Sequence, residues 1–236
     1  MSDQSFEELL AEAQIGSLDA QCELGNRYRS GAGVERDEGQ AFYWYAQAAE
    51  RGRADAQYAM GDMYDWGQGA PQSYARAVQW YLKAAGQGHV NAQWKLGRMY
   101  TNGQGVPRDN QRAARWYGMS AEQAGADRQW QLGEMYSNGL GAQRDYEQAV
   151  YWYAKAAERA GADKQWQLGE MFSAGQGVRQ NKQRAAHWYS KSAEQANADK
   201  QWQLGKMFAS GRGVLQDKQQ AAHWYSKSAE QANADK

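Results

Sequence analysis

Two rows of side chains recur at intervals of 36 residues, and their types suit binding chemistry. The first row is mostly aromatic and consists of Cys22, Tyr58, Trp94, Trp130, Trp166 and Trp202. The second row changes sign freely and consists of Asn26, Asp62, Arg98, Glu134, Glu170 and Lys206. Trp, Tyr and Arg carry much of the binding energy at protein interfaces, and charges there set partner choice. We therefore expect these partner-binding residues: Tyr58, Asp62, Trp66, Trp94, Arg98, Trp130, Glu134, Trp166, Glu170, Trp202 and Lys206.

A competing interpretation assigns the Trp rings to packing between neighbouring repeats. The two interpretations can coexist, because a Trp can pack one face of its ring and present the other. Trp66 is the least repeat-like aromatic, since the other repeats have Ser, Asn or Ala at its position. We expect Trp66 to contribute to specificity. The pair Trp44-Tyr45 recurs in every repeat, which predicts structural core.

Motifs for catalysis or cofactor binding are missing from the sequence. Gly31-x-Gly33 lacks the third Gly and the preceding strand of a dinucleotide fingerprint, and there is no P-loop, His-Glu-x-x-His or Gly-x-Ser-x-Gly. His187 and His223 lie one repeat apart, which separates them by about 8 to 10 Å or more at helix-packing distances. We expect no enzymatic activity, no catalytic residue, no cofactor and no metal site.

Composition excludes further classes of function. The chain has 236 residues, 27 basic and 27 acidic side chains, and one Cys. Balanced charge provides no clustered basic surface for nucleic acid or an anionic membrane. Cys22 alone forms neither an intramolecular disulfide nor a zinc site. With no apolar stretch near the roughly 20 residues of a membrane span and no signal peptide at the start, we expect a cytoplasmic protein, or a periplasmic one if the chain is already processed.

The period of 36 residues covers nearly the whole chain and predicts six helix-turn-helix repeats. In the first copy, the apolar residues Ala20, Leu24 and Tyr28 have helical spacing, and so do Ala41 and Tyr45 of the second helix. A Gly-x-Gly between the two helices supplies residues that tolerate positive φ.

Predicted N-caps mark the start of each helix. For the first helices they are Asp19, Asp55, Asn91, Asp127, Asp163 and Asp199, and for the second helices Asp37, Ser73, Asp109, Asp145, Asn181 and Asp217. The linkers between repeats contain Gly52 and Gly88, then Gly125, Gly161, Asn197 and Asn233 one position later. We interpret them as left-handed C-caps that shift by one residue, and we expect this shift to alter how neighbouring repeats stack.

The chain divides into a capping helix within residues 1–16, where Ser5 and Glu8 have capping-box spacing, and six repeats. The repeats span about 17–52, 53–88, 89–124, 125–160, 161–196 and 197–233. Residues 234–236 look like the start of a truncated or missing further repeat. At this end we expect exposed apolar surface near Ala221, Trp224 and Tyr225 to favour self-association.

The repeat resembles the Sel-one-like repeat, a branch of the tetratricopeptide superfamily. The resemblance rests on units such as Ala-Gln-Trp-Lys-Leu-Gly-Arg-Met-Tyr-Thr-Asn-Gly-Gln-Gly-Val-Pro-Arg-Asp at 92–109, and it spans residues 17–233. It implies an all-α, right-handed superhelical solenoid, with a concave groove lined by the first helices and an adaptor or scaffold role toward a partner protein or peptide. The two recurring rows match positions that contact ligands in tetratricopeptide domains.

The same resemblance leaves two alternatives. Some bacterial members of the family are immunity proteins that neutralise a secreted toxin, and this role predicts one tight, dedicated partner. Cysteine-rich relatives have been linked to β-lactam binding or hydrolysis, but those carry a Cys pair in each repeat, whereas this chain has Cys22 alone.

Overall fold

The computed structural model describes residues 5–234, and over this range it contains thirteen α-helices and no β-strand, which confirms the all-α class. The chain forms two compact units, Met1–Gln123 and Ala124–Lys236. The first unit contains α1 (Phe6–Gln14), α2 (Leu18–Ser30), α3 (Glu38–Glu50), α4 (Ala54–Trp66), α5 (Tyr74–Gly86), α6 (Val90–Asn102) and α7 (Asn110–Gln123). The second contains α8 (Ala126–Asn138), α9 (Tyr146–Ala160), α10 (Ala162–Ala174), α11 (Lys182–Gln195), α12 (Ala198–Ser210) and α13 (Lys218–Ala234).

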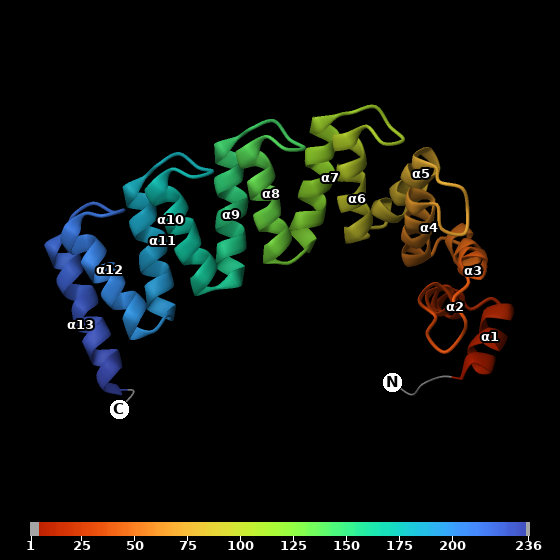
Figure 1. The fold of residues 1–236 in the computed structure, drawn as a ribbon, viewed down its shortest axis with the longest axis horizontal. Helices are drawn as coiled ribbons and strands as arrows, with labels where there is room; N and C mark the ends of the chain where they lie inside the picture. The colour runs from red at the N-terminus through yellow and green to blue at the C-terminus, as the bar shows by residue number, and fades with distance from the viewer. Residues whose placement is uncertain (1–4, 235–236) are drawn as a thin grey trace. The chain divides into compact units, whose positions relative to one another are not determined.

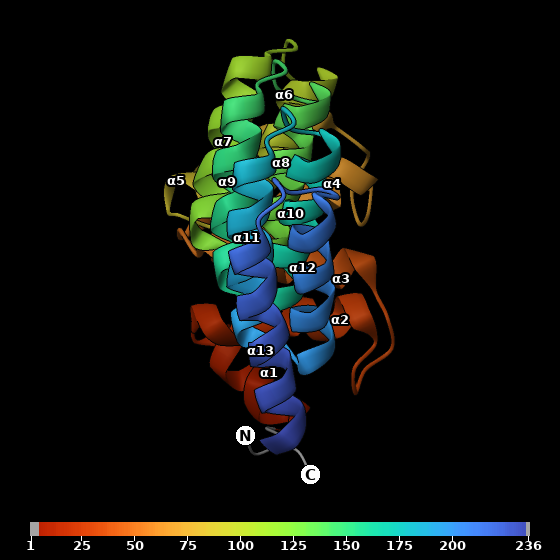
Figure 2. The same cartoon turned by 90° about the vertical axis from the view of Figure 1, so that its left-hand side faces the viewer.

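Each repeat is a pair of helices, and within a unit the pairs stack side by side. In the second unit, α8, α10 and α12 form one layer and α9, α11 and α13 form the other (Figure 2). The Gly-x-Gly loops of this unit lie along one edge, which is the upper edge in Figure 1. The first helices therefore share one face of the unit, as the repeat pattern predicts.

A Gly–Tyr contact holds the two helices of every repeat together. The first helix carries the Gly and the second carries the Tyr, in the pairs Gly25–Tyr45, Gly61–Tyr81, Gly97–Tyr117, Gly133–Tyr153, Gly169–Tyr189 and Gly205–Tyr225. A Cβ placed on Gly61 would lie 2.4 Å from Cδ1 of Tyr81, so the ring fits only against a residue without a side chain. Tyr45 and Tyr81 are fully buried at these contacts.

The predicted N-caps of the second helices and the predicted Gly turns that end the first helices are confirmed. Asp37, Ser73, Asp145 and Asn181 cap α3, α5, α9 and α11 with their side chains, and Asp109 and Asp217 accept from the first backbone N–H groups of α7 and α13. Ser5 also forms the expected capping box with Glu8. The first Gly of each Gly-x-Gly, at 31, 67, 103, 139, 175 and 211, is a left-handed C-cap.

The predicted caps of the first helices are wrong by two residues. These helices begin earlier, and their N-cap residues are Ser17, Arg53, His89, Gly125, Gly161 and Asn197. The acidic residues expected as caps instead lie in the first turn, where a carboxylate still interacts favourably with the positive end of the helix dipole. Asp is favoured both at the N-cap and in the first turn, so its presence near a helix start does not show where the helix begins.

The interpretation of the later linkers as left-handed C-caps is also wrong. Gly125 and Asn197 have φ of −75° and −76° and are N-caps of the next helix, while Asn233 lies within α13. Gly161 has positive φ, at 85°, but its ψ of −163° is outside the left-handed helical region. The second helix α9 runs longer than those of the first unit, and at Gly161 one residue is both the C-cap of α9 and the N-cap of α10.

The Gly-x-Gly loops of the two units lie against different parts of the preceding repeat. In the first unit, a Cβ on Gly105 would lie 2.4 Å from the carbonyl of Tyr74, at the start of the preceding second helix. In the second unit, a Cβ on Gly213 would lie 2.6 Å from Oγ of Ser173, on the preceding first helix. The Gly-x-Gly loop therefore contacts a different helix of its neighbour in each unit.

Buried Gln side chains join neighbouring repeats, a role that the sequence analysis missed. Gln57 Nε2 donates to Ala49 O at 3.1 Å, and Gln201 Nε2 donates to Ala193 O at 3.2 Å. Each carbonyl lies at the end of the previous helix and also accepts a backbone N–H of the linker, so the Gln adds a second bond that ties one repeat to the next.

The apolar surface expected near the C-terminal end is buried within the second unit. Ala221 and Trp224 are 4% and 2% exposed, and Tyr225 packs against Trp202. The exposed apolar side chains in this region are instead Trp202 and Leu215. Residues 235–236, which belong to the predicted further repeat, lie outside the described residues.

Replacing Gly61 with Ala should destabilise the first unit by about 1 to 3 kcal/mol, because the new methyl group forces the Tyr81 ring out of place. This loss outweighs the gain of about 1 kcal/mol in helix propensity. Gly86→Ala is the matched control, since a Cβ there meets no atom within 4 Å. Urea denaturation should show opposite signs for the two variants, and equal effects would contradict the Gly–Tyr contact.

Alkaline pH should unfold the protein through its buried tyrosines. Burial raises the pKa of Tyr45, Tyr153 and Tyr189 to about 12, whereas a phenol in the unfolded chain titrates near 10. Their stabilising contribution is therefore complete below about pH 10 and is lost as the pH rises through about 12. Urea midpoints measured from pH 8 to 12 should fall over this window. Tyr189→Phe should reduce the fall, whereas Tyr43→Phe, at a half-exposed ring, should leave it unchanged.

Candidate functional site

The structure places each Trp of the predicted aromatic row against the Tyr of its own repeat. Ring centroids lie 4.6 or 4.7 Å apart in the pairs Trp94–Tyr117, Trp130–Tyr153, Trp166–Tyr189 and Trp202–Tyr225. Trp130 and Trp166 are only 5% and 8% exposed, whereas Trp202 is 48% exposed. Burial favours the packing interpretation for Trp130 and Trp166, while Trp202 presents its ring.

The following repeat accounts for this difference in exposure. Lys164 Nζ lies 4.3 Å from the Trp130 ring centroid, and Lys200 Nζ lies 5.9 Å from that of Trp166. Each lysine stands at the start of the next first helix along the chain. A cation above an aromatic face adds attraction to the area that its methylene groups cover.

In the first unit, the predicted charges Asp62 and Arg98 pair with groups of the chain itself. Asp62 forms an ion pair with Lys95 at 2.7 Å and accepts a hydrogen bond from the Tyr81 hydroxyl, also at 2.7 Å. Arg98 pairs at 2.9 Å with Asp65, which is almost fully buried. We call Asp62, Asp65, Lys95 and Arg98 the four-charge network. Asp65 and Lys95 were not among the predicted site residues, because their partners lie in a neighbouring repeat.

Trp66 and Tyr58 lie in the same unit as the four-charge network. Trp66 is 62% exposed, with Lys95 Nζ 5.6 Å from its ring centroid. Tyr58 is half-buried and stacks on His89, with centroids 4.6 Å apart. Trp66 is therefore the predicted site residue of this unit with the most ring surface available to a partner.

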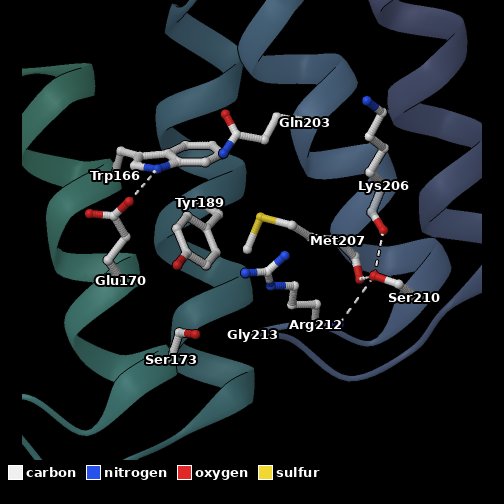
Figure 3. Close-up of a pocket in the computed structure, with 10 residues that line it drawn as sticks. All are labelled: Trp166, Glu170, Ser173, Tyr189, Gln203, Lys206, Met207, Ser210, Arg212 and Gly213. Atoms are coloured by element: carbon white, nitrogen blue, oxygen red, sulfur yellow. Dashed lines mark hydrogen bonds between the residues drawn. The ribbon is translucent and has the colours of Figure 1, made fainter.

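A pocket of about 510 Å³ lies in the second unit, between neighbouring first helices (Figure 3). We call it the second-unit pocket, and its lining residues are Trp166, Glu170, Ser173, Tyr189, Gln203, Lys206, Met207, Ser210, Arg212 and Gly213. Three of them, Trp166, Glu170 and Lys206, are sequence-predicted site residues. Trp166 Nε1 donates to Glu170 Oε1 at 3.1 Å, so the two predicted rows meet on one wall.

Arg212 lines the pocket but was not among the predicted site residues, although the sequence marks it as unusual. It occupies the middle position of its Gly-x-Gly, where the other repeats have Ala32, Gln68, Gln104, Leu140 and Gln176. It is thus the charged residue in a set of otherwise neutral ones. Figure 3 shows its guanidinium directed toward Tyr189 and Met207.

A smaller cavity in the first unit is lined mainly by charges that already have partners. Its volume is about 450 Å³, and Arg53 pairs there with Asp19 and Asp55. Cys22 also lines it, and burial raises the pKa of this thiol to about 11, which leaves it protonated and unreactive at neutral pH. This cavity therefore offers fewer unpaired groups to a ligand than the second-unit pocket does.

The described residues provide no metal centre and no membrane span. Over residues 5–234, no three His, Cys, Asp or Glu side chains come together as metal ligands. None of the helices in that range is long and apolar enough to cross a bilayer.

Comparison with protein families identifies the repeat. The Sel1 repeat model matches residues 18–52, 54–89, 90–124, 129–160, 165–197 and 201–233. The chain belongs to the Sel1 repeat family. Sel1 repeat proteins generally mediate protein–protein interactions and are typically non-catalytic, and membership agrees with the solenoid class expected from the sequence.

Solved structures of Sel1 repeat proteins resemble this chain over almost its whole length. A protective antigen present in uropathogenic Escherichia coli strains is 42% identical, with a TM-score of 0.68 over 97% of this chain and 49% of the antigen. A Sel1 repeat protein from Oxalobacter formigenes is 36% identical, with a TM-score of 0.61 over 95% of this chain and 65% of that protein. The chain therefore spans about half to two thirds of the length of these relatives.

A more distant likeness is to the immunity protein Pa5087 from Pseudomonas aeruginosa, at 21% identity and a TM-score of 0.47 over 80% of this chain and 72% of that protein. At this distance, the likeness says nothing about what this Sel1 repeat chain binds. No curated protein matches the sequence.

Two substitutions at one repeat position test the burial of the aromatic row. Trp130→Leu should destabilise the second unit by about 2 to 4 kcal/mol, because it leaves a gap beneath Lys164 and beside Tyr153. Trp202→Leu should cost less than about 1 kcal/mol, because half of that ring is already exposed. Urea denaturation measures both, and equal losses would show that Trp130 is not a core residue.

Proposed function

We propose that this Sel1 repeat chain is a non-catalytic protein-binding module that holds a peptide segment of a partner in the second-unit pocket. The observation that carries the proposal is the pocket itself, which brings Trp166, Glu170 and Lys206 together from neighbouring repeats. These residues come from the two rows whose types suit partner binding. Their adjacency in space supports a shared role.

The dimensions and chemistry of the pocket support a peptide as its ligand. A volume of about 510 Å³ falls within the range of ordinary ligand sites and accommodates a few side chains. Met207 and the edges of the mostly buried Trp166 and Tyr189 rings supply apolar surface, which lies beside polar groups from Glu170 and Ser210. A peptide can bury one apolar side chain against the apolar part of this lining while its neighbouring polar groups form hydrogen bonds with the polar part.

The remaining predicted site residues extend the proposed surface along each unit. Trp202 and Trp66 offer exposed rings, and Glu134 is an exposed charge on α8. Trp94 and Tyr58 are half-buried and contribute ring edges. We assign Asp62 and Arg98 a smaller share, because a partner would have to compete with their internal ion pairs.

The proposed role is that of an adaptor, which holds more than one partner, whereas an immunity protein holds one partner tightly. The number of unrelated peptide classes that the chain binds distinguishes these roles. Several classes with micromolar Kd support the adaptor, and one class with nanomolar Kd favours the immunity alternative.

Blocking the pocket tests the proposal. Twelve-residue peptides are selected from a random phage library on the wild-type chain, and their Kd is measured by fluorescence anisotropy. Gln203→Trp places a large ring in the lining at an exposed position and should weaken binding at least tenfold, or about 1.4 kcal/mol.

Gln219→Trp, at an exposed position of α13 outside the lining, is the matched control and should bind as the wild type does. Circular dichroism confirms that both variants remain folded. If Gln203→Trp binds the selected peptides unchanged, the second-unit pocket is not the peptide site.

A further inference from the structure

The second-unit pocket contains two cations that the chain leaves without a carboxylate partner. Lys206 and Arg212 both line it, and neither forms an ion pair with any residue in the described range 5–234. Glu170 is the carboxylate of the lining, and its Oε1 accepts a hydrogen bond from Trp166 Nε1 on the same helix, α10, across the pocket from α12 (Figure 3). With two cations and one anion, the lining carries an excess positive charge.

In the four-charge network of the first unit, the cation at the equivalent position has an internal carboxylate partner. Three repeats before Lys206 stands Arg98, and three repeats before Ser173 stands Asp65. In the first unit, Arg98 donates to Asp65 Oδ2 at 2.9 Å, and Lys95 lies 3.5 Å from the same oxygen. In the second unit, the cation remains at position 206, but the carboxylate is replaced by the hydroxyl of Ser173.

Arg212 adds a second donor group at the same place. Its backbone N–H donates to Ser210 Oγ, which anchors the loop, while its guanidinium reaches into the lining beside Tyr189 (Figure 3). A guanidinium binds a carboxylate through two parallel hydrogen bonds, which a neutral group cannot match. Loop geometry does not need this cation, because the other five repeats form the same turn with Ala, Gln or Leu.

We propose that the second-unit pocket binds an acidic segment of a partner protein, whose Asp or Glu side chains pair with Arg212 and Lys206. This proposal rests on the proposed function and adds the chemistry of the partner. The partner supplies in trans the carboxylate that Asp65 supplies internally in the first unit. Apolar residues beside the acidic ones contact Trp166 and Met207.

The test uses an array of twelve-residue peptides, acetylated and amidated at their ends, in matched pairs. One member of each pair contains Asp or Glu, and the other contains Asn or Gln at the same positions. The acidic members should bind the wild-type chain at least tenfold more tightly at 50 mM salt, and less so at 500 mM salt, as charge pairing requires. Arg212→Gln and Lys206→Gln should each weaken the acidic members about five- to tenfold and leave the amide members unchanged.

Two control variants remove the same charge outside the pocket. Arg179→Gln and Lys218→Gln alter exposed cations of the second unit that do not line it, and they should bind as the wild type does. Ser173→Asp introduces the carboxylate that Asp65 provides at the same repeat position in the first unit, and it should also weaken binding of the acidic members. Ala174→Asp adds the same charge at the next residue, outside the lining, and should not. Circular dichroism checks the fold of every variant.

The outcomes separate this inference from the proposed function. If acidic and amide members bind equally, or if the controls weaken binding as much as the pocket variants do, acidic recognition is overturned while peptide binding stands. A further set of amide members keeps a free C-terminus; if these bind best, the pocket takes a terminal carboxylate and the side-chain proposal is wrong. If no member binds in any form, both proposals fail.

Discussion

The close approach of a Gly on the first helix to a Tyr ring on the second is the constraint on which each repeat depends. Without a Cβ at Gly61, Gly133 or Gly169, the ring lies directly on the helix backbone. Leu, Ile, Val and Phe are scarce in this chain, so aromatic rings and small Ala residues form most of the core. The Tyr hydroxyl then reaches the edge of the first helix, which carries the surface that a partner would meet.

The hydroxyl end of that Tyr connects the core to the candidate site. Tyr81 donates to Asp62 in the four-charge network, and Tyr189 lines the second-unit pocket. In the first unit, Asp62, Asp65 and Lys95 lie around the Tyr81 phenol and neutralise one another, whereas in the second unit the equivalent Tyr189 lines a pocket together with Ser173, Gln203 and Arg212. One scaffold therefore presents a closed ion-pair network in one unit and an open, positively charged pocket in the other.

The parts of the fold that local chemistry determines could be predicted from the sequence. The period of 36 residues revealed the helix pairs, and the Gly-x-Gly turns and second-helix caps such as Asp37 followed from side-chain hydrogen bonding to adjacent backbone. The first-helix caps could not be located, because Asp19 suits the first turn as well as it suits the cap. The packing of Trp130 and the pairing of Asp65 depend on contacts between repeats, which sequence spacing within one repeat does not specify. Arg212 could have been found by asking which repeat departs from the others.

The Gly–Tyr contact lies wholly inside one repeat, and this has a consequence for how such a chain changes by duplication. Residues 162–197 and 198–233 differ at only seven positions, and the contact is intact in both copies. At four of those positions, the pairs Glu170/Lys206, Ser173/Ala209, Ala174/Ser210 and Gln176/Arg212, at least one member lines the pocket. A copied repeat inherits a complete folding unit, so substitutions that follow the copying event can accumulate on the binding face while the core remains as it was.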